Sequence, residues 1–324
     1  MSVLVYTENW DGKFKKSTFE LLSYANEIAK KLNTETIGIS IGNVSTDELS
    51  NLGNYGANKV LSFSDSRISS LENTVFSSII SQAAIKVGAQ VIILSNNLTG
   101  KAIAPRLSVK LKAGLVSAVV ALPSSVEPFE VKKKAFTGSA FANVKVNSAI
   151  KILTLSQNSY QINQSEDVAI VENFEATINN ADFKTKVTDT QKTTGKIILN
   201  DAEIIVSGGR GMKGPENWGA IEELASVLGA GTACSRPVSD EGWRSHDEHV
   251  GQTGKIVAPN LYFAIGISGA VQHVAGVSGS KCIVAVNTDK DATVFEVADY
   301  GIVGDARQVL PSLIEAFKEF KAEH

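Results

Sequence analysis

The chain has 324 residues, of which 43% are hydrophobic and 20% are charged, and its formal net charge at pH 7 is −3. This length predicts two domains, and the small net charge argues against a nucleic-acid-binding protein. No apolar run approaches the roughly 18 residues that a membrane-spanning helix needs, so we expect no membrane insertion. The two cysteines, Cys234 and Cys282, form no CxxC motif and indicate neither a zinc ribbon nor a thioredoxin-like site.

The N-terminal residues, MSVLVYTENWDGKFKK, lead directly into a strand-like run. They lack the basic start, apolar stretch and small-residue cleavage site of a signal peptide, and they do not resemble a mitochondrial transit peptide. We therefore predict a cytoplasmic protein of bacterial type. A mature form from the mitochondrial matrix stays open.

Up to residue 111, short apolar runs alternate with segments whose apolar residues recur at helical spacing. Strands are predicted at residues 3–6, 36–41, 59–63 and 91–94. Helices are predicted at residues 17–32, 75–87 and 97–111. Such alternation predicts an α/β fold, with a mostly parallel sheet flanked by helices.

From residue 115 onward, strand-like runs follow one another without intervening helices, at residues 115–122, 131–136, 141–146 and 149–155. We expect them to extend the same sheet in antiparallel fashion, which closes an N-terminal α/β domain at residues 1–160. Residues 161–196 are polar, with few long apolar runs, and they are the predicted connecting segment or hinge.

A second α/β domain is predicted at residues 197–324. Its strands are expected at residues 203–206, 261–265, 282–286 and 302–303. Its helices are expected at residues 218–228 and 306–320, with another that starts at residue 269. Three strand-to-helix junctions stand out at residues 206–214, 264–273 and 284–292.

Glycine turns and helix N-termini at such junctions allow close approach to phosphate groups, so the three junctions suggest an extended nucleotide at the sheet edge. The first junction, VSGGRGMKG, is neither GxGxxG nor a P-loop, and alone it is equally a connecting turn.

Six motifs together are more specific than any one junction. They are SGGRG at 207–211, SRPVSD at 235–240, VGQTGKIVAPNLY at 250–262, GISGAVQHVAG at 266–276, AVNTDKDA at 285–292 and VADYGIVGDA at 297–306. In this order and spacing the sequence resembles the FAD-carrying α subunit of electron-transfer flavoproteins. The resemblance is dense over residues 200–320 and covers the rest in outline.

The resemblance implies a noncovalently bound FAD and a role for each matching residue. Arg236 would lie against the isoalloxazine ring, Thr253 near its redox-active nitrogen, and His273 near its pyrimidine carbonyl. Asn287 and Asp305 would address the adenosine half. The implied cofactor-binding residues are Arg210, Ser235, Arg236, Val250, Gly251, Gln252, Thr253, Ser268, Gly269, Ala270, Val271, Gln272, His273, Asn287, Asp305 and Ala306.

The resemblance also implies an electron carrier without substrate chemistry or catalytic residues of its own. Such a subunit works in a heterodimer with a β subunit, which binds AMP in most members and would contact residues 1–160. Electrons would come from dehydrogenases, such as the acyl-CoA dehydrogenases of fatty acid β-oxidation. They would pass to a respiratory-chain acceptor such as a membrane quinone oxidoreductase.

Three alternatives remain open. One is a flavin- or nicotinamide-dependent enzyme that shares the fold, another is a subunit of an electron-bifurcating flavoprotein, and the third is a non-redox nucleotide-binding protein. His246 and His249 are spaced like a pair of metal ligands, but we expect a solvated loop there and no metal site. Trp218 and Trp243 are predicted to be packing residues.

Overall fold

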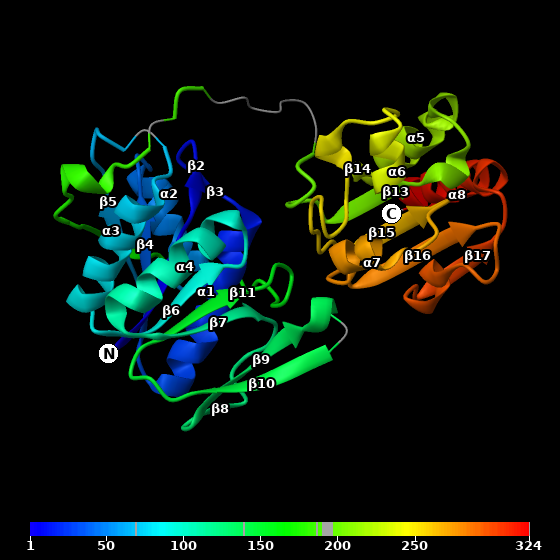
Figure 1. The fold of residues 1–324 in the computed structure, drawn as a ribbon. Coiled ribbons are helices and arrows are strands. Elements are labelled where there is room, and N and C mark those ends of the chain that lie inside the picture. Colours follow the sequence, from blue (N-terminus) through cyan, green and yellow to red (C-terminus); the bar gives the residue numbers. More distant parts are fainter. Residues whose placement is uncertain (69, 139, 186, 190–196, 324) are drawn as a thin grey trace. The chain divides into compact units, whose positions relative to one another are not determined.

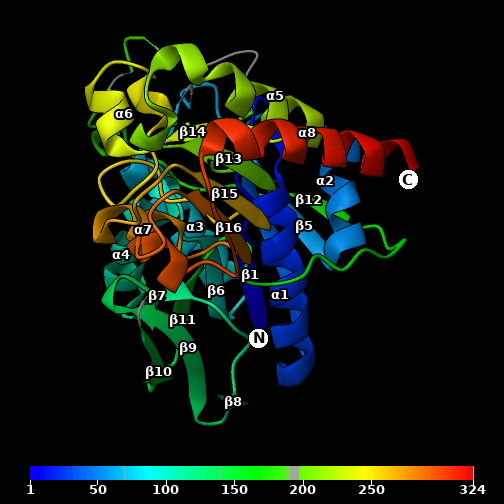
Figure 2. The same cartoon turned by 90° about the vertical axis from the view of Figure 1, so that its right-hand side faces the viewer.

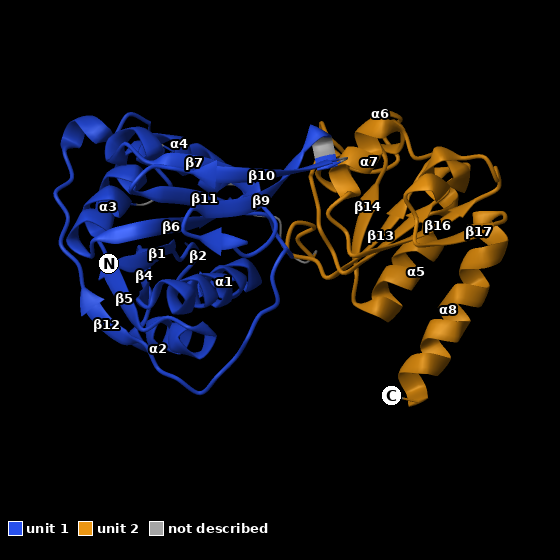
Figure 3. Cartoon of the chain, turned by 90° about the horizontal axis from the view of Figure 1, so that it is seen from below, with its two compact units in different colours: residues 1–191 blue, residues 192–324 orange. Residues whose placement is uncertain are grey.

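The computed structural model describes residues 1–68, 70–138, 140–185, 187–189 and 197–323. The chain divides into two compact units, residues 1–191 and 192–324 (Figure 3). Each unit has its own mostly parallel sheet with helices against it, which confirms the predicted α/β class.

The first sheet has the strand order β10-β9-β7-β11-β6-β1-β4-β5-β12, with β8 paired to β9 (Figure 1). Its strands are β1 (Ser2–Tyr6), β4 (Glu35–Ile41), β5 (Lys59–Phe63), β6 (Ala89–Ser95), β7 (Gly114–Val119), β8 (Ser125–Val126), β9 (Phe129–Ala135), β10 (Ala140–Val146), β11 (Lys151–Leu155) and β12 (Ile170–Asn173). The unit's helices are α1 (Lys16–Leu32), α2 (Thr46–Ser50), α3 (Asn73–Lys86) and α4 (Leu98–Leu111). A small hairpin joins β2 (Asn9–Trp10) to β3 (Lys13–Phe14).

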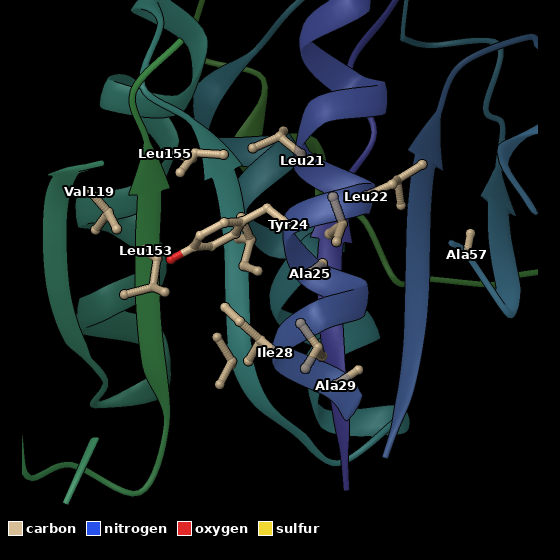
Figure 4. Close-up of a cluster of buried hydrophobic side chains, with 14 of the residues drawn as sticks. Leu21, Leu22, Tyr24, Ala25, Ile28, Ala29, Ala57, Val119, Leu153 and Leu155 are labelled. Atoms are coloured by element: carbon tan, nitrogen blue, oxygen red, sulfur yellow. The ribbon is translucent and has the colours of Figure 1, made fainter. Parts of the chain in front are cut away.

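The two faces of this sheet carry separate apolar cores. Because successive strand residues point to opposite faces, Val3 and Val5 of β1 belong to the core beneath α1, and Leu4 belongs to the core beneath α3 and α4. Figure 4 shows α1 laying Tyr24 and Ile28 against the strands. Both side chains are fully buried, and Ile28 is one of the apolar residues whose helical spacing predicts this face.

One part of the predicted sheet is wrong. Strand β11 was expected in an antiparallel extension, but it lies between β6 and β7 and is parallel to both. Its residues after Lys151 are all buried, as suits a central parallel strand covered on both faces. Only the β8, β9 and β10 pairings are antiparallel among the described strands of this sheet.

Much of the predicted connecting segment lies against the first unit. Strand β12 pairs with β5 in parallel, and Phe174 contacts Phe63 edge to face. Further along, the amide side chain of Gln82 exchanges hydrogen bonds with the backbone of Thr177. Residue 186 and residues 190–196 of the predicted segment lie outside the described residues.

The second sheet is parallel throughout, in the order β14-β13-β15-β16-β17. Its strands are β13 (Ile204–Gly208), β14 (Gly231–Cys234), β15 (Leu261–Ile265), β16 (Cys282–Asn287) and β17 (Tyr300–Val303). Its helices are α5 (Gly219–Leu228), α6 (Arg236–Asp240), α7 (Val271–Val277) and α8 (Ala306–Glu323). Helices α5 and α8 lie side by side (Figure 2) and pack on one face, while Val277 of α7 belongs to the core on the other.

Candidate cofactor site

The strand order of the second unit reverses beside β13. The chain runs from β13 outward to β14 on one side, and then returns to β15 on the other. At such a reversal, open parallel sheets bind ligands in a crevice at the carboxyl ends of the strands. A cavity of about 550 Å³ lies there, lined only by residues between Arg210 and Asn287.

Most of the residues that the sequence singled out line this cavity. They are Arg210, Ser235, Arg236, Val250, Gly251, Gln252, Thr253, Ser268, Ala270, Gln272, His273 and Asn287. The lining also contains residues that the sequence did not single out for cofactor binding. They are Gly211, Pro237, Asp240, His249, Gly266 and Ile267.

Four of the implied residues are not in the lining. Gly269 has a φ of +88°, and a Cβ built on it would lie 2.2 Å from the backbone nitrogen of Val294, so glycine is required there by packing. Val271 is largely exposed, and Ala306 is buried in the core beneath α8. Asp305 binds Lys213 at 3.3 Å and Arg307 at 2.8 Å, and Arg307 holds the pKa of this carboxyl well below its usual range.

The SGGRG motif owes its glycines to a crossing of two loops. The backbone nitrogen of Gly211 donates to the oxygen of Gly266, at 2.9 Å. Gly266 has a φ of +62°, and a Cβ on it would lie 2.9 Å from backbone atoms of Gly211. A Cβ on Gly209 would lie 2.2 Å from the oxygen of Gly266. Side chains at these positions would push the loops apart, so the glycines set the shape of the cavity floor.

Arg236 is the first residue of α6 and is held at two points. Its Nε donates to Asp240 Oδ2 at 3.2 Å, and its Nη1 donates to the hydroxyl of Thr253 at 3.3 Å. Asp240 stands one helical turn after Arg236, which is the spacing that brings two side chains together. The guanidinium is thus oriented while much of it stays exposed to the cavity and solvent.

The loop that leads to the cavity wall is anchored by a buried ion pair. Arg244 donates to both carboxylate oxygens of Glu248, at 2.7 and 3.0 Å, and its guanidinium lies over the ring of Trp218. Glu248 is 5% exposed and His249 is 7% exposed, so the predicted solvated loop is wrong at these two residues. Glu248 can be buried although it is charged, because its two hydrogen bonds with Arg244 compensate the cost of desolvation.

His249 lines the cavity, whereas His246 is exposed and bonds Ser239 through Nδ1, at 2.8 Å. Burial lowers the pKa of His249, and the nearby Arg236 lowers it further. No cluster of three or more metal-ligating side chains occurs among the residues that the structure describes.

His273 is the most deeply buried titratable side chain among the implied cofactor residues, at 8% exposed. Its Nε2 lies 3.0 Å from the hydroxyl oxygen of Tyr262, a fully buried residue of β15. Burial lowers the pKa of His273 to about 4, with a smaller opposing effect from the backbone of Val250. The imidazole is consequently neutral at pH 7, and its Nδ1 has no hydrogen-bond partner of regular geometry in the described part of the chain.

The donor set of the cavity fits an anionic flavin nucleotide. Arg236 supplies an oriented cation and Arg210 a largely exposed one, and the start of α7 beside Ala270 supplies backbone amides of the kind that bind phosphate oxygens. His273 lines the cavity as a neutral imidazole. These observations agree with the FAD that the sequence implies.

Comparison with known families matches both units. Residues 3–182 match the family described as electron transfer flavoprotein domain, and residues 198–278 match the electron transfer flavoprotein FAD-binding domain. The second match contains the cavity lining apart from Asn287.

Similar proteins cover nearly the whole chain. The electron transfer flavoprotein subunit alpha of Bacillus subtilis strain 168 is 34% identical over 98% of this chain and 97% of its own length. The subunit of the same name from Thermoanaerobacterium thermosaccharolyticum is 35% identical over 98% of both chains. A protein of Anaerotignum propionicum called acryloyl-CoA reductase electron transfer subunit beta is 31% identical over 98% of this chain and 96% of its own.

Proposed function

The chain belongs to the electron-transfer flavoprotein family, as an FAD-binding α subunit, and from this premise we propose its finer role. It holds FAD at the carboxyl edge of the second sheet and carries electrons without converting a substrate of its own. It takes them from dehydrogenases, such as acyl-CoA dehydrogenases, and passes them to a respiratory-chain acceptor such as a membrane quinone oxidoreductase.

The observation that carries this proposal is the cavity of the second unit. Cations, backbone amides and a neutral imidazole converge on it from the ends of neighbouring parallel strands. When bound, FAD supplies the redox chemistry, since its isoalloxazine ring accepts and releases electrons.

The side chains of this chain would control how readily charge is accepted. Arg236, oriented by Asp240 and Thr253, provides a positive charge that favours added negative charge on a ring beside it. Ser268 and Gln272 line the cavity at the start of α7, and with Gly269 they would hold the pyrophosphate and ribityl chain. Asp305 remains a predicted contact of the adenosine half, reached outside the cavity.

A heterodimer with a β subunit is the assembly that the family implies. We propose that the first unit contacts this partner, that the partner binds AMP, and that the predicted connecting segment, residues 161–196, serves as a hinge for the second unit. The described chain has no helix with the length and apolarity needed to cross a membrane. As a separate proposal, we place the protein in the cytoplasm. The name of the Anaerotignum relative favours a second candidate redox partner, an acryloyl-CoA reductase.

Reductive titration of the co-purified heterodimer tests the electron-carrier role. We expect an oxidised flavin spectrum, FAD in the supernatant after denaturation, and full reduction by dithionite in one-electron steps. Arg236→Ala should reduce the preference for reduced over oxidised FAD by about tenfold, because a fixed charge beside the ring is lost.

The matched control is Lys318→Ala, which removes an exposed cation of the same unit that pairs with Glu223. It should leave the titration unchanged. A colourless complex that cannot be reconstituted with FAD would contradict the proposal and favour a non-redox nucleotide-binding protein.

A further inference from the structure

His249 lines the cavity, and the proposed function gives it no role. Its backbone forms a parallel bridge with Cys234 at the end of β14, and its oxygen accepts from the nitrogen of Lys255 at 2.9 Å. Burial raises the pKa of the Cys234 thiol to about 12, so this neighbour adds no charge. The imidazole of His249 is therefore attached to a fixed stretch of backbone at the carboxyl edge of the second sheet.

Two glycines of the VGQTG turn lie against the ring of His249. A Cβ built on Gly251 would lie 3.3 Å from Nε2, and a Cβ built on Gly254 would lie 2.7 Å from Nδ1. The turn is closed by a hydrogen bond of 3.1 Å from the nitrogen of Gly254 to the oxygen of Gly251. Because backbone approaches it so closely, the ring is confined beside the turn that carries Thr253.

Among the ionisable residues that line the described cavity, His249 is the one suited to change its charge near neutral pH. Arg210 and Arg236 keep their protons, and Asp240 is the ion-pair partner of Arg236. Burial lowers the pKa of His273 to about 4, so that ring stays neutral. Neither ring nitrogen of His249 makes a hydrogen bond in the described part of the chain, which leaves them able to bind a proton.

The surroundings of His249 favour its neutral form while the cavity holds no added negative charge. Burial lowers its pKa below the ordinary 6.5, and the positive charge of Arg236 on α6 lowers it further. Asp240, on the same helix, opposes these effects, whereas His246 of the preceding turn adds to them. His273 of α7 is coupled as well, since a positive charge on His249 lowers the pKa of His273. New negative charge in the cavity would act in the opposite direction, because an opposite charge nearby favours the protonated form.

We propose that His249 is a proton-accepting residue, which binds a proton from solvent when a ligand in the cavity gains negative charge. Identifying that charge as an electron accepted by bound FAD rests on the proposed function. The electron comes from an external donor, such as a dehydrogenase or dithionite, and the proton comes from water. No bond of the ligand breaks. His249 becomes an imidazolium, and its positive charge offsets the charge of the added electron.

This coupling makes the acceptance of an electron depend on pH. Between the pKa of His249 in the oxidised complex and its higher pKa in the reduced complex, one proton enters with the electron. The preference for reduced over oxidised FAD then falls by up to about tenfold for each unit of rising pH. Outside that range His249 has the same charge in both complexes and contributes no pH dependence.

Histidine NMR of the heterodimer, in its oxidised and its fully reduced form, tests the uptake of the proton. The histidines are labelled with ¹³C at the imidazole Cε1, and His249→Gln identifies the signal of His249 by its loss. We expect the midpoint of its pH titration to rise by about one unit or more in the dithionite-reduced complex. Equal midpoints in the two forms would overturn the proposal.

Reductive titration of wild type and His249→Gln between about pH 5 and pH 8, the range in which histidines titrate, tests the consequence. Any pH dependence that belongs to the flavin itself remains in both proteins. At the acid end the variant should show a preference for reduced FAD about tenfold weaker than that of the wild type, and at the alkaline end the two should agree. The same pH dependence in both proteins would also contradict the role of His249.

His246→Gln is the matched control, because His246 is exposed and bonds Ser239 instead of lining the cavity. It should keep both the pH dependence and the shift of the His249 midpoint. If His249→Gln loses its FAD, variants of the other three histidines assign the His249 signal by elimination, and the wild-type comparison still decides. A wild-type complex without FAD would overturn the proposed function together with this inference, whereas equal midpoints in a complex that holds FAD overturn this inference alone.

Discussion

The two sheets carry different groups at the carboxyl ends of their strands, at the point where the strand order reverses. In the first unit, the strand order reverses between β1 and β6, and a carboxylate sits where their following segments meet. Glu8 accepts from Asn97 at 2.6 Å and from the hydroxyl of Thr99 at 2.7 Å, at the start of α4. In the second unit, the equivalent edge is bordered by glycines and holds a cavity.

The difference shows that a parallel sheet offers a possible ligand site at the carboxyl ends of its strands. The residues of the following loops decide whether a side chain or a cavity occupies that site. A helix N-terminus attracts an anion, and in the first unit the chain supplies that anion from its own Glu8. In the second unit the start of α7 borders open space with two arginines nearby. The architecture is shared, and the polar groups at the edge differ.

The largest expected effect comes from a substitution that distorts the cavity at the carboxyl edge of the second sheet. Gly266→Ala adds a Cβ in the left-handed region and against the backbone of Gly211, so we expect loss of FAD and a cost of about 3 kcal/mol or more. Gly229→Ala is the control, since Gly229 has a φ of +65° but nothing within 4 Å of the added Cβ.

FAD content and urea unfolding of both variants measure the effect. Gly229→Ala should keep its FAD and cost about 1 kcal/mol, the strain of a left-handed alanine alone. Equal behaviour of the two variants would show that the loop crossing does not shape the site.

The wall of the cavity depends on the buried ion pair behind it. Glu248→Ala leaves the largely buried Arg244 without its bidentate partner, so we expect the free energy of unfolding to fall by about 3 kcal/mol. Glu223→Ala removes an exposed partner of Lys318 and should cost no more than about 0.5 kcal/mol. Urea unfolding compares them, and a small effect of Glu248→Ala would mean that the loop is held by other contacts.

Acid should destabilise the second unit through His273. Its folded pKa of about 4 lies below the ordinary value of 6.5, so the unfolded chain binds the proton more readily between these values. Stability is therefore full above about pH 6.5 and falls as the pH drops toward 4, by up to about 3 kcal/mol at 1.36 kcal/mol per unit.

The pH dependence of urea unfolding, with His273→Gln as the variant, measures this contribution. The variant should lose that part of the slope between pH 6.5 and 4, whereas a substitution of the exposed His246 should keep it. An unchanged slope in His273→Gln would assign the acid sensitivity to other groups.

The smallest expected effect lies at Glu8, at the carboxyl edge of the first sheet. Glu8→Gln replaces one acceptor facing Asn97 or Thr99 with a donor, and we expect a loss of about 1–2 kcal/mol with FAD retained. Glu27→Gln, which alters the exposed pair with Lys30, is the control and should be neutral. Release of FAD from the Glu8 variant would show that the two edges are coupled.

The sequence predicts most of the fold where its periodicity is strong. Helix α1 and strands β5 and β15 agree with their expected positions. A helical repeat of apolar residues over a long segment predicts the helix, and short apolar runs predict the two strands. Strand β14, with the small residues of Gly231–Cys234, gives no such signal, and strand periodicity alone does not reveal that β11 is parallel.

The candidate site is predicted through its motifs, and its supporting contacts are not. Arg236 and Asp240 are four residues apart, the spacing at which two side chains on one helix face meet, so the sequence does hold a signal for their pairing. The burial of Glu248 and the contact of Tyr262 with His273 depend on residues brought together by the fold. No local sequence pattern predicts either the burial of Glu248 or this contact.

The FAD content of the heterodimer in three forms tests the central claim that the second edge is the cofactor site. The wild type, Gly266→Ala and Glu8→Gln would each be co-expressed with the β subunit, purified and denatured, and the released FAD measured against protein. The account predicts equal FAD in the wild type and Glu8→Gln, and almost none in Gly266→Ala. FAD retained by Gly266→Ala and lost from Glu8→Gln would contradict it.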